Sequence, residues 1–267
     1  MRLLAVGDVC GNVGCEEIHR KLPDIKRKYN IDAVIVNGEN SAVGNGITPQ
    51  TAEYIFACGA DIITGGNHSL RRREIYDYLD SNPLLLRPHN LPDAEFGSGY
   101  CVADFGRFRL GVINLSGIIY LEKCGASNPF DAADELIEKV KEDGADIIAV
   151  DFHAEATSEK RALALYLDGR VSAFFGTHTH VQTADEQILP SGTGYITDLG
   201  MTGPVNSVLG VKSEIIINRL KSKDLSKFEF ADGEGMLCGC IFDIKGGATV
   251  WGHRFGWGRF SPQRKLQ

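Results

Sequence analysis

Short apolar runs alternate with longer segments of mixed polarity in the first part of the chain. Three of these runs are too short for helices and are interpreted as buried strands: residues 3–7, 32–37 and 60–66. The segments between them predict a helix near residues 13–29 and a second helix from Pro49, with Thr48 as its N-cap and Gly59 at its end. This βαβα order constrains the chain to an α/β fold.

The later part of the chain carries more strand signals. Residues 99–115 contain two apolar runs around a glycine-containing turn, which predicts a hairpin. Helices are expected over 131–144 and 157–169, the latter opening on a capping box, and strands over 145–153 and 171–180. The last third consists of short apolar runs separated by turn residues, which we interpret as a meander of antiparallel strands.

These elements predict two sheets packed face to face with helices outside, in a single domain over residues 1–267. Hydrophobic residues make up 43% of the chain and charged residues 24%, a composition typical of globular proteins rather than of disordered ones. No repeat, linker or low-complexity segment divides the sequence.

Charge and cysteine content narrow the function classes. The formal net charge is −7, so no overall basic surface is expected to attract nucleic acid, and an anionic substrate would need a local positive centre such as a metal ion. No stretch is long enough to cross a bilayer, and the N-terminal apolar run is too short for a signal peptide. The seven cysteines are an odd number without a secretory signal, which predicts reduced thiols and a cytoplasmic location.

Five predicted strands are each followed by side chains that can bind metal or act in catalysis. In chain order, these side chains are Asp8, then Glu39 and Asn40, then Asn67 and His68, then His153, and finally His178 and His180. Ligands of α/β folds collect outside the carboxyl ends of strands, so neighbouring strands would bring these side chains together.

This set mixes carboxylate, imidazole and amide groups, which suits manganese, iron or zinc better than magnesium or calcium. The ligands are too many for one ion but enough for two ions that share a bridging carboxylate. Two such ions, about 3.5–4 Å apart, can clamp a phosphate between them. In an extended segment, residues two apart point the same way, so His178 and His180 could reach two adjacent ions.

Each position alone also has an ordinary structural interpretation. Asp8 could cap a helix, the NGEN and GGNH segments could be turns, and His153 could be a hydrogen-bonded core histidine. The GTHTH segment at 176–180 is the hardest of the five to explain in this way. Their joint occurrence at successive strand ends favours a functional site.

The order GDV, NGEN, GGNH, a lone histidine and GTHTH resembles the calcineurin-like metallophosphoesterases, and within them the YmdB-like subfamily. The resemblance covers nearly the whole chain. Its most specific part runs from DFHAEATSEK through DLGMTGP, because that segment is long and nearly without gaps.

The resemblance implies a four-layer α/β/β/α sandwich with two mixed sheets and two divalent metal ions per chain, iron or manganese first and zinc as a further option. It places Asp8 and His180 on the first ion, with Asn40 near it or bound to it, and Glu39 as the bridge. The second ion is held by three residues: Asn67, His153 and His178. Asn40 and His68 are implied to contact the substrate phosphate and to act in catalysis, His68 without binding metal.

The sequence departs from the broad family at three positions. Cys10 stands where a metal-binding histidine is usual, and we interpret it as a packing residue. Glu39 replaces the usual Asp, and Ser69 follows His68 where Asp or Glu is frequent, so the group that orients His68 must come from elsewhere.

The implied activity is hydrolysis of small cyclic nucleotides, 2′,3′-cyclic ones such as 2′,3′-cAMP above all, by in-line attack of a metal-activated hydroxide. His68 would stabilise charge on the phosphate or protonate the leaving alkoxide. Three alternatives stay open: a phosphomonoesterase such as a 5′-nucleotidase, a metal-bound regulatory protein with residual hydrolysis, and a nucleic-acid binder, which the net charge disfavours. The resemblance also implies a homo-oligomer. It leaves a protein or RNA partner open, and no membrane partner is expected.

Overall fold

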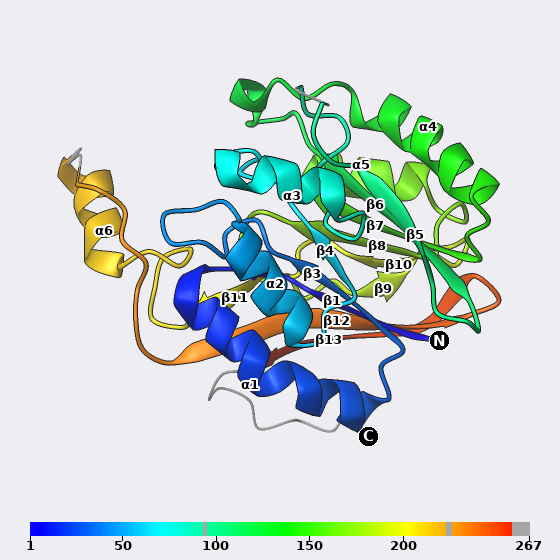
Figure 1. The fold of residues 1–267 in the computed structure, drawn as a ribbon, viewed down its shortest axis with the longest axis horizontal. Helices are drawn as coiled ribbons and strands as arrows, with labels where there is room; N and C mark the ends of the chain where they lie inside the picture. Colours follow the sequence, from blue (N-terminus) through cyan, green and yellow to red (C-terminus); the bar gives the residue numbers. More distant parts are fainter. Residues whose placement is uncertain (93–94, 223–225, 258–267) are drawn as a thin grey trace.

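The computed structural model describes residues 1–92, 95–222 and 226–257, and these form two mixed sheets packed face to face (Figure 1). The first sheet has the order β2-β11-β12-β1-β3-β4, with β13 paired to β12, and the second has the order β5-β6-β7-β8-β10-β9. The strands of the first sheet are β1 (Arg2–Val6), β2 (Asp8–Val9), β3 (Ala33–Asn37), β4 (Ile62–Thr64), β11 (Met201–Pro204), β12 (Gly235–Lys245) and β13 (Ala248–Trp257). Those of the second are β5 (Tyr100–Asp104), β6 (Arg109–Ser116), β7 (Ile147–His153), β8 (Ala173–Thr177), β9 (Gln187–Ile188) and β10 (Gly194–Ile196).

Helices cover the outer face of each sheet, which gives the four-layer arrangement visible in Figure 1. The helices are α1 (Gly11–Tyr29), α2 (Pro49–Ala57), α3 (Tyr76–Ser81), α4 (Pro129–Glu142), α5 (Thr157–Tyr166) and α6 (Ser213–Ser222), with short 3₁₀ turns at Arg73–Ile75 and Glu122–Cys124. Helices α1 and α2 pack on the first sheet, and α4 and α5 on the second. Helix α6 projects from the body of the molecule at the left of Figure 1. No described helix is both long and apolar enough to cross a bilayer.

Strand β1 shows why the apolar runs are continuous rather than alternating. Leu4 and Val6 face the α1–α2 layer, whereas Leu3 and Ala5 face the second sheet, because successive side chains of a strand point to opposite faces. Phe242 of β12 belongs to the same layer between the sheets and is 1% exposed. Strands buried on both faces are therefore apolar over most of their length, and buried polar residues such as Asp151 occur near the ends that face the site.

Parallel pairing brings the strand ends to one edge. Strands β1, β3 and β4 are parallel neighbours in the first sheet, as are β6, β7, β8 and β10 in the second. The expected hairpin is present as the antiparallel pair β5–β6. The expected helix start at Thr48 is also confirmed. The Thr48 hydroxyl accepts from the Thr51 amide, and the Thr51 hydroxyl accepts from the Thr48 amide, which together form a capping box.

Two expected elements differ in the structure, and one helix was not expected. The last third is not a simple antiparallel meander, because β10 pairs parallel with β8 and β11 pairs parallel with β2. Helix α5 has Ala156 as its N-cap with no side-chain cap, since the Glu159 carboxylate instead accepts from the Ile118 amide at 2.9 Å. Helix α6 was not anticipated at all.

Candidate metal centre

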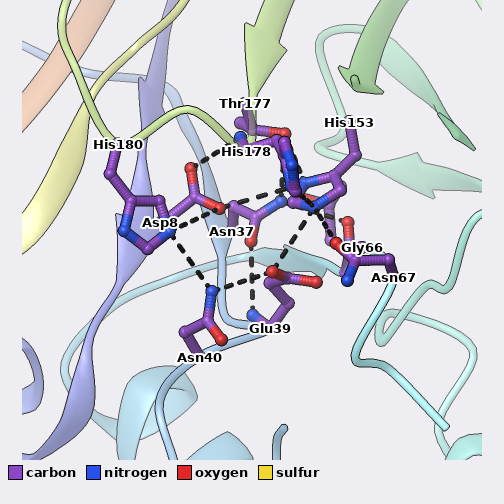
Figure 2. A network of polar contacts seen from close by, with 12 residues as sticks. Asp8, Asn37, Glu39, Asn40, Gly66, Asn67, His153, Thr177, His178 and His180 are labelled. Carbon is purple, nitrogen blue, oxygen red and sulfur yellow. Dashed lines mark hydrogen bonds and ion pairs between the residues drawn. The ribbon is translucent and has the colours of Figure 1, made fainter. Parts of the chain in front are cut away.

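All seven predicted metal ligands gather at the carboxyl ends of β1, β3, β4, β7 and β8. Figure 2 shows their side chains pointing toward one another from the two sheets. Loops deliver most of them, whereas His153 is the last residue of β7. The residues are Asp8, Glu39, Asn40, Asn67, His153, His178 and His180.

The first part of the centre surrounds His153, which is fully buried. Its Nε2 lies 2.9 Å from Asn67 Oδ1, 3.0 Å from His178 Nδ1 and 3.4 Å from Glu39 Oε1. Glu39, His153 and His178 offer ligand atoms that all lie within 4.8 Å of one another. We refer to these three residues and Asn67 as the His153 group.

The chemistry of this group fits a cation. The Glu39 carboxylate and the Asn67 amide oxygen only accept hydrogen bonds, and one nitrogen of a neutral imidazole also only accepts. Acceptor atoms that converge on a buried point repel one another unless a positive charge lies among them. Burial, together with nearby His153, lowers the pKa of His178 to about 3, so its imidazole is in the neutral form that metal binding requires.

The second part of the centre contains Asp8, Asn40 and His180, which we call the Asp8 group. Asp8 Oδ1 lies 3.8 Å from His180 Nε2, and Asn40 Nδ2 lies 3.3 Å from the same nitrogen. Asp8 is 0% exposed, and its Oδ1 has no hydrogen-bond partner among the described residues. Burial raises the pKa of Asp8, although the nearby His180 and His153 imidazoles act in the opposite direction. A second cation at this place would remove that cost.

Glu39 lies between the two groups. Its Oε1 accepts from Asn40 Nδ2 at 2.8 Å and faces His153 Nε2, so one oxygen contacts both sides of the centre. Burial alone would raise the pKa of Glu39, but its pairing with His153 and His68 holds the pKa well below the usual range. Glu39 is therefore a carboxylate at the position expected of a bridge.

The backbone around His178 and His180 differs from the expected extended segment. The strand β8 ends at Thr177, and the φ angles of His178 and His180 are 99° and 63°. Both angles lie in the left-handed region that residues other than glycine rarely adopt. Backbone strain of this kind is concentrated at functional sites. A tight turn, rather than the period of two of a strand, therefore directs the two imidazoles into different groups.

A buried ion pair holds this turn, and sequence reasoning missed it. Asp198 Oδ2 accepts from the Thr179 amide at 3.1 Å and from Lys160 Nζ at 2.7 Å, with both side chains at most 1% exposed. On the other side of the turn, the His178 amide donates to Asp8 Oδ2 at 3.1 Å. The available signal was Asp198 itself, a carboxylate two residues after the strand at Gly194–Ile196.

The structure also supplies the group that orients His68. His68 Nδ1 lies 3.1 Å from Asn40 Oδ1, and the Asn40 amide cannot be reversed because its nitrogen faces the Glu39 carboxylate. The His68 side chain is 25% exposed and thus lies at the mouth of the centre. As the structure stands, the Asn40 oxygen is committed to His68 rather than turned toward Asp8.

Cys10 lies beside the Asp8 group but behind it. Its sulfur is 3.7 Å from His180 Nδ1, whereas His180 Nε2 is the nitrogen that faces Asp8. The thiol also donates to the Asp8 carbonyl oxygen at 3.5 Å. This placement agrees with packing against the ring rather than with a place among the converging ligand atoms.

Gly66 leaves the room that the centre needs, so Gly66→Ala is expected to weaken Mn²⁺ binding by at least about tenfold. A Cβ at this position would lie 2.2 Å from Glu39 Oε2 and 2.4 Å from His153 Nε2, too close for either ligand to stay in place. Titration calorimetry with Mn²⁺ measures the effect. Gly252→Ala is the matched control, because its Cβ would come no closer than 3.9 Å to another residue. Equal affinity in both variants would contradict the geometry.

Comparison with known proteins agrees with this geometry. Residues 4–250 match a family model described as YmdB-like protein. The chain is 46% identical over 244 residues to the 2′,3′-cyclic-nucleotide 2′-phosphodiesterase of Bacillus subtilis strain 168, covering 91% of each chain.

Two solved structures resemble this one closely. A phosphatase from Mycoplasma pneumoniae superposes with a TM-score of 0.90 at 34% identity, over 96% of this chain and 93% of that one. A hypothetical protein from Thermus thermophilus superposes with a TM-score of 0.89 at 38% identity, over 96% and 99% of the two chains.

Proposed function

The chain belongs to the YmdB-like family and has the metallophosphoesterase fold, and we propose that it is a phosphodiesterase acting on 2′,3′-cyclic nucleotides. The observation that carries the proposal is the convergence of carboxylate, amide and imidazole acceptors in the His153 group and the Asp8 group. The similarity to the Bacillus enzyme supports the substrate class, with cleavage of the 2′-ester and the phosphate retained on the 3′-oxygen.

We propose two divalent ions per chain. The His153 group supplies two imidazoles and an amide oxygen for one ion, the Asp8 group supplies a carboxylate and an imidazole for the other, and Glu39 serves both. Such a mixed nitrogen and oxygen set suits manganese or iron, and zinc also fits. When bound, the ions supply Lewis acidity for the phosphoryl oxygens and lower the pKa of water.

The side chains then have separate tasks. Asp8 and Glu39, both buried, would provide negative charge that balances the ions. Asn40 holds His68 through the 3.1 Å contact to Nδ1, which leaves His68 Nε2 for the substrate at the mouth of the centre. From there His68 gives a proton to the ribose oxygen that leaves phosphorus.

Turnover of 2′,3′-cAMP tests the proposal. Protein loaded with Mn²⁺ is expected to produce 3′-AMP, and a sample treated with EDTA is expected to produce none until Mn²⁺ is restored. Separation of 3′-AMP from 2′-AMP by chromatography identifies the cleaved ester. If Mn²⁺-loaded protein leaves the cyclic nucleotide intact while binding two ions, the substrate class is wrong.

A phosphomonoesterase is the second candidate, because a similar structure is that of a phosphatase. The same assay with 5′-AMP and 3′-AMP as substrates distinguishes the two. A larger kcat/KM for either monoester than for 2′,3′-cAMP would favour this candidate.

The homo-oligomeric state and the cytoplasmic location stay predictions. The seven cysteines are free thiols in the structure, in keeping with a reducing compartment. Light scattering on the purified chain would measure the oligomeric state directly.

A further inference from the structure

A layer of buried polar side chains lies directly beneath the metal centre. Thr177 and Asp151 are both 0% exposed, on the neighbouring strands β8 and β7. The Thr177 hydroxyl donates to Asp151 Oδ1 at 2.7 Å and lies 3.0 Å from His153 Nδ1. Figure 2 shows Thr177 on the far side of the His153 ring from Asn67 and Glu39.

Asp151 is held so that it accepts from Thr177. Its other oxygen, Oδ2, accepts from the Thr64 hydroxyl at 2.5 Å and from Asn37 Nδ2 at 3.0 Å. Asn37 and Thr64 end the strands β3 and β4, so this carboxylate ties both sheets together below the ligands. Donors from the first sheet occupy one oxygen, and the other is left for the hydroxyl of Thr177.

The single hydroxyl hydrogen of Thr177 then decides the form of His153. A threonine hydroxyl donates once, and this donation goes to Asp151. Toward His153 the oxygen can only accept, so Nδ1 must carry the hydrogen. In the neutral imidazole that metal binding requires, Nε2 then carries the lone pair. Nε2 is the nitrogen that faces Asn67 Oδ1 and Glu39 Oε1.

We propose that Thr177, with its hydrogen committed to Asp151, is a positioning residue that keeps His153 in the tautomer with Nε2 free to bind metal. The inference rests on the proposed metal centre and assigns a task to a residue outside the predicted ligand set. The partners that orient ligand histidines typically change metal affinity about 10–100-fold when they are removed.

The test compares Thr177→Val, which removes the hydroxyl at nearly the same side-chain size, with Thr177→Ser, which keeps the hydroxyl. Thr193→Val is the matched control, because Thr193 is also 0% exposed and its hydroxyl donates to the Val171 carbonyl oxygen, outside the centre. Calorimetric titration with Mn²⁺ gives the affinity of each full-length variant. Nitrogen-15 NMR of labelled histidines, in Zn²⁺-loaded and metal-free protein, shows which ring nitrogen of His153 carries hydrogen, with His153→Ala to assign the signal.

Wild type, Thr177→Ser and Thr193→Val are expected to keep a protected Nδ1–H on His153. Thr177→Val is expected to lose that signal and to bind Mn²⁺ at least about tenfold more weakly at one of two sites. An unchanged tautomer in Thr177→Val, or the same loss of affinity in Thr193→Val, would overturn the inference. If Thr177→Val does not fold, Thr177→Ala gives the same readouts.

Failure of the proposed function gives a different result. If wild type binds Mn²⁺ and depends on Thr177 but leaves 2′,3′-cAMP intact, the substrate class fails and the positioning role stands. If wild type binds no metal, the tautomer in metal-free protein still shows whether Thr177 sets it.

Discussion

Replacing Glu39 by Gln is expected to lower kcat/KM for 2′,3′-cAMP by at least about 10³-fold and to reduce the bound Mn²⁺ below two ions per chain. Glutamine keeps the shape of the side chain but loses the charge on the residue between the Asp8 group and the His153 group. Ions that stabilise a phosphoryl transition state are worth several kcal/mol, and each 1.36 kcal/mol changes the rate about tenfold. Loss of about 4 kcal/mol therefore accounts for the expected factor.

Two measurements separate loss of metal from loss of fold. Equilibrium dialysis against Mn²⁺ followed by elemental analysis counts the ions, and circular dichroism follows unfolding. Glu17→Gln is the matched control, because Glu17 is also a buried carboxylate, 4% exposed, but pairs with Lys21 on α1. We expect this control to bind two ions and to keep its activity. Turnover of Glu39→Gln within tenfold of wild type would show that Glu39 does not serve the metals.

The gathering of the proposed ligands at one edge was predictable from the sequence because its signal is local. A polar residue that follows an apolar run marks the carboxyl end of a strand, and parallel strands bring these ends to the same edge of the sheet. Asp8, Glu39 and His153 each follow this rule. The expectation for Thr48 succeeded for the same reason, since a helix cap depends on residues within one turn.

The parts that could not be predicted depend on partners far away in the chain. The Glu159 carboxylate could have capped its own helix, but the Ile118 amide competes for it successfully. The turn at His178 is set by Asp8 and Asp198, which lie on either side of it in the sequence. Asn40 as the partner of His68 likewise follows from three-dimensional packing. No spacing rule links such residues.

Thr177 and Asp151 are an intermediate case. Both are polar residues inside otherwise apolar strands, next to or two residues before a predicted ligand. That pattern marks a buried polar layer, because an unpaired polar group at such a position would be costly. The pattern does not show which residue pairs with which, and this pairing carries the chemical consequence for His153.

His68→Ala is expected to slow hydrolysis of 2′,3′-cAMP by about 10²–10⁴-fold while leaving two Mn²⁺ ions bound, because general acid catalysis contributes about that factor. Its imidazole contacts Asn40 Oδ1 at 3.1 Å and is 25% exposed, in contrast to His153, the fully buried proposed ligand. His253→Ala on the strand β13 is the control, since His253 is exposed and far along the chain from every predicted ligand.

The leaving group separates a proton donor from a residue that only stabilises charge. The ribose alkoxide needs a proton as the ester bond breaks, whereas the nitrophenolate of bis(p-nitrophenyl) phosphate leaves without one. A general acid therefore predicts a large loss for His68→Ala with 2′,3′-cAMP and a loss at least about tenfold smaller with the aryl ester. Equal losses with both substrates would assign His68 to charge stabilisation. Loss of metal from His68→Ala would instead show that His68 is itself a metal ligand, contrary to the proposal.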